Sequence, residues 1–284
     1  MMFGCWGDPE DDYYRGEYYA EMLKVVCLVI KEADPEAKVL FGGLLLNCNP
    51  DDPPETHPGS GDIKECKSSR YLEGALENEG GDYFEGVSFH ADDYYLNALG
   101  HYGNDNWRSS WRSTGLSLIA KGKFIRDILR EYGYTDKFLV ISEGALLCGS
   151  TGVEEFCKID EFHQTKANYV TQAYTAAKAE GLLANVWYSI RGWRGSGLVK
   201  NNDIQFPAYT ALQFAEGQFD KAQYRGEITS FPGIMGYEFN RAGGYFWVIW
   251  AMDDDTYSVF LPDQPTAIFD SVGTELLVEK TQSQ

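Results

Sequence analysis

The sequence has no long apolar run, few basic residues and no Cys-x-x-Cys pair, and each absence argues against a class of protein. No stretch approaches the roughly 20 apolar residues of a membrane-spanning helix, and no basic start followed by an apolar run marks a signal peptide. The 24 Lys and Arg against 43 Asp and Glu give a net charge of -19, which disfavours nucleic acid and anionic membranes as partners through repulsion. Without a Cys-x-x-Cys pair, neither a zinc site nor a thioredoxin-like motif is expected.

What the sequence does contain is typical of a globular protein with many aromatic side chains. Its 284 residues suffice for one large α/β domain or for a domain with an appendage, and 44% hydrophobic residues allow a sizeable core. Aromatic residues make up 15% of the chain, a supply that suits flat faces stacked on sugar rings and equally suits an aromatic core.

One short segment, Phe138-Leu-Val-Ile-Ser-Glu-Gly-Ala145, reads as a buried strand that ends on a carboxylate. Gly144 is expected to let the chain turn sharply after Glu143. Because an ionised Glu is costly to bury without a partner, Glu143 should either line a cavity or be held by a nearby base.

Apolar runs alternate with helical patterns along the first three quarters of the chain. Helices are expected at about 17–33, 70–79, 116–132 and 162–180, and strands at 37–43, 84–90, 138–145 and 183–189. On the first helix, Tyr18, Met22, Val25, Val26 and Val29 share one face. This order is typical of a parallel β/α fold with long loops after its strands, where such folds keep their chemistry.

The pattern changes after about residue 217. Segments 236–241, 244–251, 256–261 and 266–270 are short alternating or apolar runs between Gly, Asp and Pro turns, which indicates antiparallel strands. We therefore predict a β/α domain over 1–217 and a small antiparallel β domain over 218–284.

Four of the six cysteines fall in pairs within single loops. Cys48 with Cys66, and Cys148 with Cys157, are predicted to form loop-closing disulfides in an oxidising compartment. Cys27 lies in a helical apolar pattern and is expected to be a buried thiol.

Several of these segments together resemble the second half of a clan A glycoside hydrolase, with the family 39 β-xylosidase and iduronidase type as the nearest branch. The resemblance rests on the segments 19–24, 30–43, 87–90 and 141–143, on Trp187-Tyr188, and on 197–199 and 207–209, in that order. It implies strands five to eight of a (β/α)8 TIM barrel, followed by the family's usual β domain.

The resemblance also implies a retaining mechanism with two carboxylates and no cofactor or metal. Glu143 matches the nucleophile on the seventh strand, and His90 ends the sixth, where it would contact the substrate or hold Glu143. A satisfied buried histidine and a core tryptophan are the structural alternatives for His90 and Trp187. The candidates for contact with a carbohydrate substrate are His90, Tyr94, Tyr95, Trp187 and Trp193.

The second carboxylate of the family belongs to an Asn-Glu-Pro motif, which does not occur in this sequence. Gly7-Asp8-Pro9 would be its degenerate form, with Asp8 as the acid. Alternatively, residues 5–11 correspond to the family's acid-rich segment that follows the motif, and the chain begins after the fourth strand. On this second interpretation the sequence is a fragment that lacks the first half of the barrel and leaves strand edges near Lys38 and Val186 exposed.

Two functions from different classes are compatible with these sequence features, and a purely structural β/α protein, with Glu143 paired to a base and no cleft, is the third alternative. The first is a retaining glycoside hydrolase, or its C-terminal half, with Glu143 as nucleophile. The second is a noncatalytic carbohydrate-binding or half-barrel protein that lacks the acid/base. The acidic composition and the predicted disulfides favour an extracellular or periplasmic location.

Overall fold

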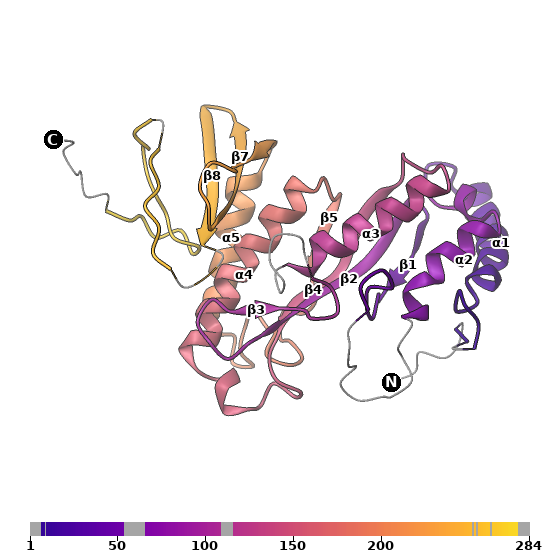
Figure 1. The fold of residues 1–284 in the computed structure, drawn as a ribbon, viewed down its shortest axis with the longest axis horizontal. Helices are drawn as coiled ribbons and strands as arrows, with labels where there is room; N and C mark the ends of the chain where they lie inside the picture. Colours follow the sequence, from indigo (N-terminus) through magenta and orange to yellow (C-terminus); the bar gives the residue numbers. More distant parts are fainter. Residues whose placement is uncertain are drawn as a thin grey trace. The chain divides into compact units, whose positions relative to one another are not determined.

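The structure is a computed structural model that describes residues 7–8, 10–53, 66–108, 116–251, 253, 255–261 and 263–277. Figure 1 shows its helices and strands. The chain divides into two compact units, each formed by three separate segments. The first unit takes residues 1–93, 103–145 and 180–187, and the second takes 94–102, 146–179 and 188–284. The predicted division at 217/218 falls within a helix of the second unit and stays a prediction.

The first unit contains helices on an open, largely parallel sheet. Its elements are α1 (Gly16–Ala33), β1 (Leu40–Leu44), the short 3-10 helix η1 (Lys67–Arg70), α2 (Tyr71–Glu77), the 3-10 helix η2 (Gly80–Tyr83), α3 (Ser117–Glu131) and β5 (Ala184–Trp187). Strands β2 (Gly86–Tyr95), β3 (Tyr102–Gly103) and β4 (Phe138–Leu147) begin in one unit and end in the other. The strand order is β1-β2-β4-β5, with β3 beside β2.

Strand β1 pairs in parallel with β2, and β4 pairs in parallel with β5, as the alternating sequence pattern predicted. Strands β1 and β5 end the sheet, so the described strands form an open sheet and no closed barrel. These are the two edges expected near Lys38 and Val186.

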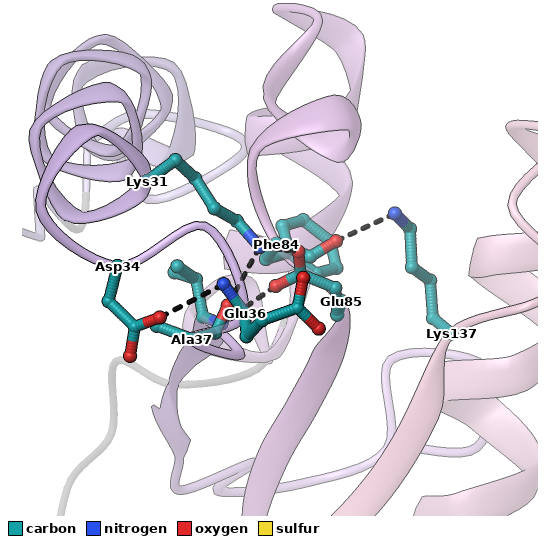
Figure 2. Close-up of polar contacts among 8 residues, drawn as sticks. Lys31, Asp34, Glu36, Ala37, Phe84, Glu85 and Lys137 are labelled. Carbon is teal, nitrogen blue, oxygen red and sulfur yellow. Dashed lines mark hydrogen bonds and ion pairs between the residues drawn. The ribbon is translucent and has the colours of Figure 1, made fainter.

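Polar contacts fix the end of α1 to the start of the sheet (Figure 2). Lys31, in the last turn of α1, donates to the carbonyl of Ala37 at 2.7 Å and forms an ion pair with Glu85. Glu85 in turn accepts a hydrogen bond from the Val39 amide at 2.7 Å. Nearby, Lys137 donates to the Phe84 carbonyl at 2.6 Å, which joins the segments that lead into β2 and β4. These contacts set where the strands begin.

The second unit combines two packed helices with a small antiparallel sheet. Its elements are the 3-10 helix η3 (Glu155–Cys157), α4 (Asp160–Ala179), α5 (Pro207–Phe219), β6 (Gln223–Glu227), β7 (Ile234–Arg241) and β8 (Gly244–Ala251). Helices α4 and α5 pack together and both carry buried alanines, which allow a close approach. Strands β6, β7 and β8 pair in sequence order, with the ring of Phe239 stacked on that of Phe246.

Two of the strands expected near the C-terminus are not formed. Within the described residues after β8, the segments 256–261 and 266–270 contain no strand, and a bridge joins Phe269 to Glu275. Apolar alternation alone does not make a strand without a neighbouring edge to pair with, and Phe260 is consequently 85% exposed.

Both predicted disulfides are present. Cys48 is bonded to Cys66 and Cys148 to Cys157, while Cys27 is a buried free thiol of α1. Among the described residues, no helix is long and apolar enough to cross a membrane.

Candidate functional site

Glu143 lies inside β4, at an irregularity of the sheet. The register between β4 and β5 pairs Ile141 with Asn185 and then Gly144 with Trp187, so β4 carries one extra residue at this point. Such a bulge bends a strand and redirects its side chains, and bulges are frequent beside active sites. The side chain of Glu143 is 42% exposed.

Gly144 has a different role from the predicted one. The chain does not turn after Glu143, because β4 continues to Leu147. A side chain at position 144 would instead meet the neighbouring strands, since an added Cβ would lie 3.1 Å from Oδ1 of Asn185 and 3.5 Å from the carbonyl oxygen of Ala91. The missing side chain therefore allows close strand packing beside Glu143.

His90 is the polar neighbour of Glu143. Its Nδ1 lies 3.5 Å from Oε2 of Glu143. His90 does not end its strand as predicted, because β2 continues to Tyr95. On the other side of the ring, an added Cβ at Gly43 of β1 would lie 2.9 Å from Nε2 of His90. Three strands thus bring Gly43, His90 and Glu143 together.

A buried lysine stands behind this pair. Nζ of Lys121, on α3, donates to the carbonyls of His90 at 2.8 Å and Leu45 at 3.1 Å, and it lies 5.9 Å from the centre of the Trp107 ring. Burial lowers the pKa of Lys121 to about 8. Sequence reasoning missed this residue, although a lysine three residues after Leu118 and four before Ile125 stands on the buried face of the helix.

Burial and the charge of Lys121 set the protonation of His90. Desolvation lowers the pKa of His90, and Lys121 lowers it further, against the opposing effect of Glu143. The imidazole is therefore neutral near pH 7. An accessible carboxylate beside a neutral imidazole suits a nucleophile or a general base, because the histidine is free to hydrogen-bond rather than to neutralise the acid.

Trp187 shares the first unit with this pair. It is the last residue of β5, is partly exposed, and pairs with Gly144, the residue after Glu143. An aromatic side chain is therefore present on β5 directly opposite the residue that follows Glu143.

The other aromatic candidates belong to the second unit. There the Arg194 guanidinium lies 5.2 Å from the centre of the Tyr94 ring and 5.3 Å from that of Trp193, and the Tyr188 ring meets Trp193 edge to face at 6.4 Å. Trp193 is 47% exposed. Tyr95 is instead buried against Phe162, and we leave it out of the proposed site.

A second buried lysine donates hydrogen bonds to the loop that carries Trp193 and Arg194. Nζ of Lys166, on α4, donates to the carbonyls of Gly195 at 2.8 Å and Gly197 at 2.6 Å. Burial lowers the pKa of Lys166 to about 7. The Cys148 amide also donates to the Arg194 carbonyl at 2.8 Å, so one end of a disulfide supports the same loop.

Asp8, the alternative acid, is engaged at the start of α1. Its carboxylate forms an ion pair with Arg15 at 2.8 Å and accepts the Glu10 amide at 3.0 Å. It lines a hollow of the first unit in which neither Glu143 nor His90 takes part. Among the described residues, no group of three His, Cys, Asp or Glu side chains is arranged to hold a metal ion.

Comparisons with known proteins place the fold. No protein-family model matches the sequence, and no protein with a curated description is similar to it. Among solved structures, a family 39 glycoside hydrolase from the gut symbiont Bacteroides cellulosilyticus WH2 is similar with a TM-score of 0.64 and 15% identity, over 95% of this chain and 51% of that one.

Two further structures are less similar to this chain. They are a glucosidase from Croceicoccus marinus (TM-score 0.49, 13% identity, 82% of this chain and 46% of that one) and a monomeric beta-xylosidase from Caulobacter crescentus CB15 (TM-score 0.44, 14% identity, 82% and 45%). The similarity to the family 39 structure shows that the fold is like that of a glycoside hydrolase, as the motifs predicted. The chain spans about half the length of each of these three proteins.

Proposed function

We propose that this chain is the part of a retaining glycoside hydrolase that carries the nucleophile, Glu143. The observation that supports this most is the exposed carboxylate beside His90, on a strand bulge of a glycoside-hydrolase-like fold. Glu143 attacks the anomeric carbon and displaces the leaving group, and water then hydrolyses the glycosyl ester to restore the carboxylate. His90 holds the carboxylate in position or binds a sugar hydroxyl.

The acid/base is proposed to come from outside the described residues. A retaining enzyme needs its second carboxylate roughly 5 Å from the nucleophile. Asp8 is held by Arg15 instead, and the chain matches only 51% of its structural neighbour. We therefore favour an Asn-Glu-Pro segment on a complementary half-barrel as the source of the proton donor.

Sugar contacts and location complete the proposal. Trp187, on the strand beside Glu143, stacks on the sugar ring. Tyr94 and Trp193 form a separate aromatic group within the second unit. The two disulfides favour an extracellular or periplasmic protein that acts on neutral glycans.

The test is covalent trapping with a 2-deoxy-2-fluoroglycoside that carries a dinitrophenolate leaving group. This leaving group departs without protonation, so the missing acid is not needed, and the fluorine slows hydrolysis of the ester. Mass spectrometry of peptides should find the glycosyl group on Glu143. The E143Q variant should show no label, and E155Q, at an exposed glutamate, should be labelled like the wild type. Label on another residue, or none across a panel of sugars, rejects the nucleophile assignment.

A noncatalytic carbohydrate-binding protein is the second candidate, and the aromatic group of the second unit favours it. The Arg194 guanidinium lies over the rings of Tyr94 and Trp193, and the Tyr188 ring meets that of Trp193. This function predicts that oligosaccharides quench tryptophan fluorescence without labelling Glu143. The W193A variant should lose the quenching, whereas F260A, which removes another exposed aromatic side chain, should retain it.

A further inference from the structure

Helix α1 carries an apolar face that is exposed. Val25, Leu28 and Val29 are 64%, 63% and 61% exposed, and Tyr18 and Val26 are exposed with them. Positions 18, 22, 25 and 29 follow one another at intervals of four, three and four residues, and all four are apolar. This spacing forms the seam by which one helix packs along another.

The opposite face of α1 is already buried. Its small or apolar residues are Gly16, Ala20, Leu23 and Cys27, and α1 packs against α2 and η2. The packing is close, because a Cβ added at Gly16 would lie 2.2 Å from the carbonyl oxygen of Tyr71. A helix that is apolar on two faces is usually covered on both, so the exposed seam needs a second partner.

The charged residues near the seam indicate that the partner is basic. At its N-terminal end lies a hollow of about 630 Å³, lined by five carboxylates and one guanidinium (Asp8, Glu10, Asp11, Arg15, Glu17 and Glu21, with Tyr18 and Asn78). The two lysines of α1 are engaged, Lys24 by Glu21 and Lys31 by Glu85. A second copy of this chain would bring more negative charge to the same place, whereas a basic segment would be attracted.

The sheet of the same unit ends next to this helix. The Tyr19 hydroxyl of α1 accepts the Gly42 amide of β1 at 3.2 Å, and the Tyr19 and Phe41 rings meet at 4.8 Å. Strand β1 is an edge of the sheet formed by the described residues. A polypeptide that continued this architecture would therefore present a helix to α1 where it adds a strand to β1.

We propose that the exposed seam of α1 is the docking surface for an amphipathic helix of another polypeptide segment, with apolar side chains at the same spacing and basic side chains at the end that faces the hollow. This deepens the proposed function, because the docked segment is the complementary half that supplies the missing acid. The evidence for this surface, the exposure and spacing of side chains on α1, does not depend on the proposed glycosidase activity.

The experiment uses residues 1–284 and a labelled synthetic 18-residue helical peptide, with leucines at intervals of four and three and lysines near one end. A scrambled peptide of the same composition has no apolar face. Fluorescence polarisation should show binding of the ordered peptide only. The V25E variant should bind at least about tenfold more weakly, because it places a charge in the seam, and E21K should also weaken binding. The V153E variant makes the same change at an exposed valine of the second unit and should bind normally.

Three results would overturn the proposal. These are equal binding of the scrambled peptide, unchanged binding by V25E, and a dimer in light scattering that V25E dissociates, which would make a second copy the occupant. Because no sugar is present, the result is independent of the labelling at Glu143. Peptide binding without labelling rejects the glycosidase function alone, and labelling without peptide binding rejects the docking surface alone.

Discussion

At the scale of single residues, Lys121 influences Glu143 indirectly, through the histidine between them. Lys121 donates to the carbonyls of His90 in β2 and of Leu45 just after β1. Burial lowers the pKa of His90, and the charge of Lys121 lowers it further. A neutral histidine forms no ion pair with Glu143, so it can position the carboxylate through a hydrogen bond without neutralising it. The lysine is therefore a positioning residue, whose effect on the carboxylate passes through His90.

Replacing Lys121 with methionine should raise the pKa of His90, because the positive charge that lowers it is removed. Proton NMR titration of the His90 ring measures this directly. The free energy of unfolding should also fall, by about 1 to 3 kcal/mol, since two buried carbonyls lose their donor. The control is K123M, at an exposed position of the same helix, and an identical His90 titration in both variants would contradict the prediction.

His163 should make the protein less stable in acid. Burial lowers its pKa to about 4, and Lys166 and Lys200 add to this effect. The unfolded chain takes up a proton near pH 6.5 and the folded chain only near pH 4, so stability is lost as the pH falls between these values. The H163F variant should lose less stability between pH 7 and 4.5, by on the order of 1–2 kcal/mol. Urea unfolding at both pH values is the measurement, and equal losses in both proteins would refute it.

At the scale of elements, α3 begins with help from a distant strand. The Ser117 amide donates to both carboxylate oxygens of Asp93 at 3.2 Å, although 24 residues separate the two. A carboxylate at a helix N-terminus satisfies an amide of the first turn and opposes the positive end of the helix dipole. The helix that carries Lys121 is thereby fixed to β2, the strand that carries His90.

The D93N variant should consequently be less stable by about 1–2 kcal/mol, because it removes the charge from a buried cap. Chemical denaturation measures the difference. The D105N variant makes the same change at an exposed aspartate and should be neutral. Equal stability of D93N and the wild type would show that the contact contributes nothing.

The sequence predicted the elements better than their ends and partners. Periodicity located α1, α3, α4 and the strands around Phe41 and Leu139, because these patterns are local. The continuation of β2 and β4 beyond His90 and Glu143 was missed, since it depends on neighbouring strands and on the bulge. For the same reason, the sequence showed an apolar face on α1 but not that this face is exposed.

In the candidate site, too, the residues with a local sequence signal were predicted, and those that depend on tertiary packing were missed. Glu143 was predicted from the strand pattern that it ends and His90 from the family resemblance, and Nδ1 of His90 lies 3.5 Å from Oε2 of Glu143. Lys121 was missed because a lysine within a helix is usually exposed. Tyr95 and Tyr94 are adjacent in sequence, yet one is buried and the other exposed, because successive side chains of a strand point to opposite faces.

At the scale of the whole molecule, no single position in the sequence divides the chain into its two units, because each unit uses three segments of the chain. A net charge of -19 is distributed over both. Like charges repel most in the compact state, where they are closest, so this charge opposes folding of the whole chain. Some ion pairs act in the other direction, among them Arg126 with Glu180 at 2.9 Å.

We expect the repulsion to outweigh the ion pairs, because acidic residues exceed basic ones by 43 to 24. The screening length falls from roughly 30 Å at 0.01 M salt to roughly 10 Å at 0.1 M, which weakens long-range repulsion more than short contacts. Raising NaCl from 0.01 M to 0.1 M should therefore raise the melting temperature by roughly 2–4 °C, about 1 kcal/mol for a chain of this size. Calorimetry at both salt concentrations tests this. A melting temperature that falls with salt would mean that pairs such as Arg126 with Glu180 dominate the electrostatics of the fold.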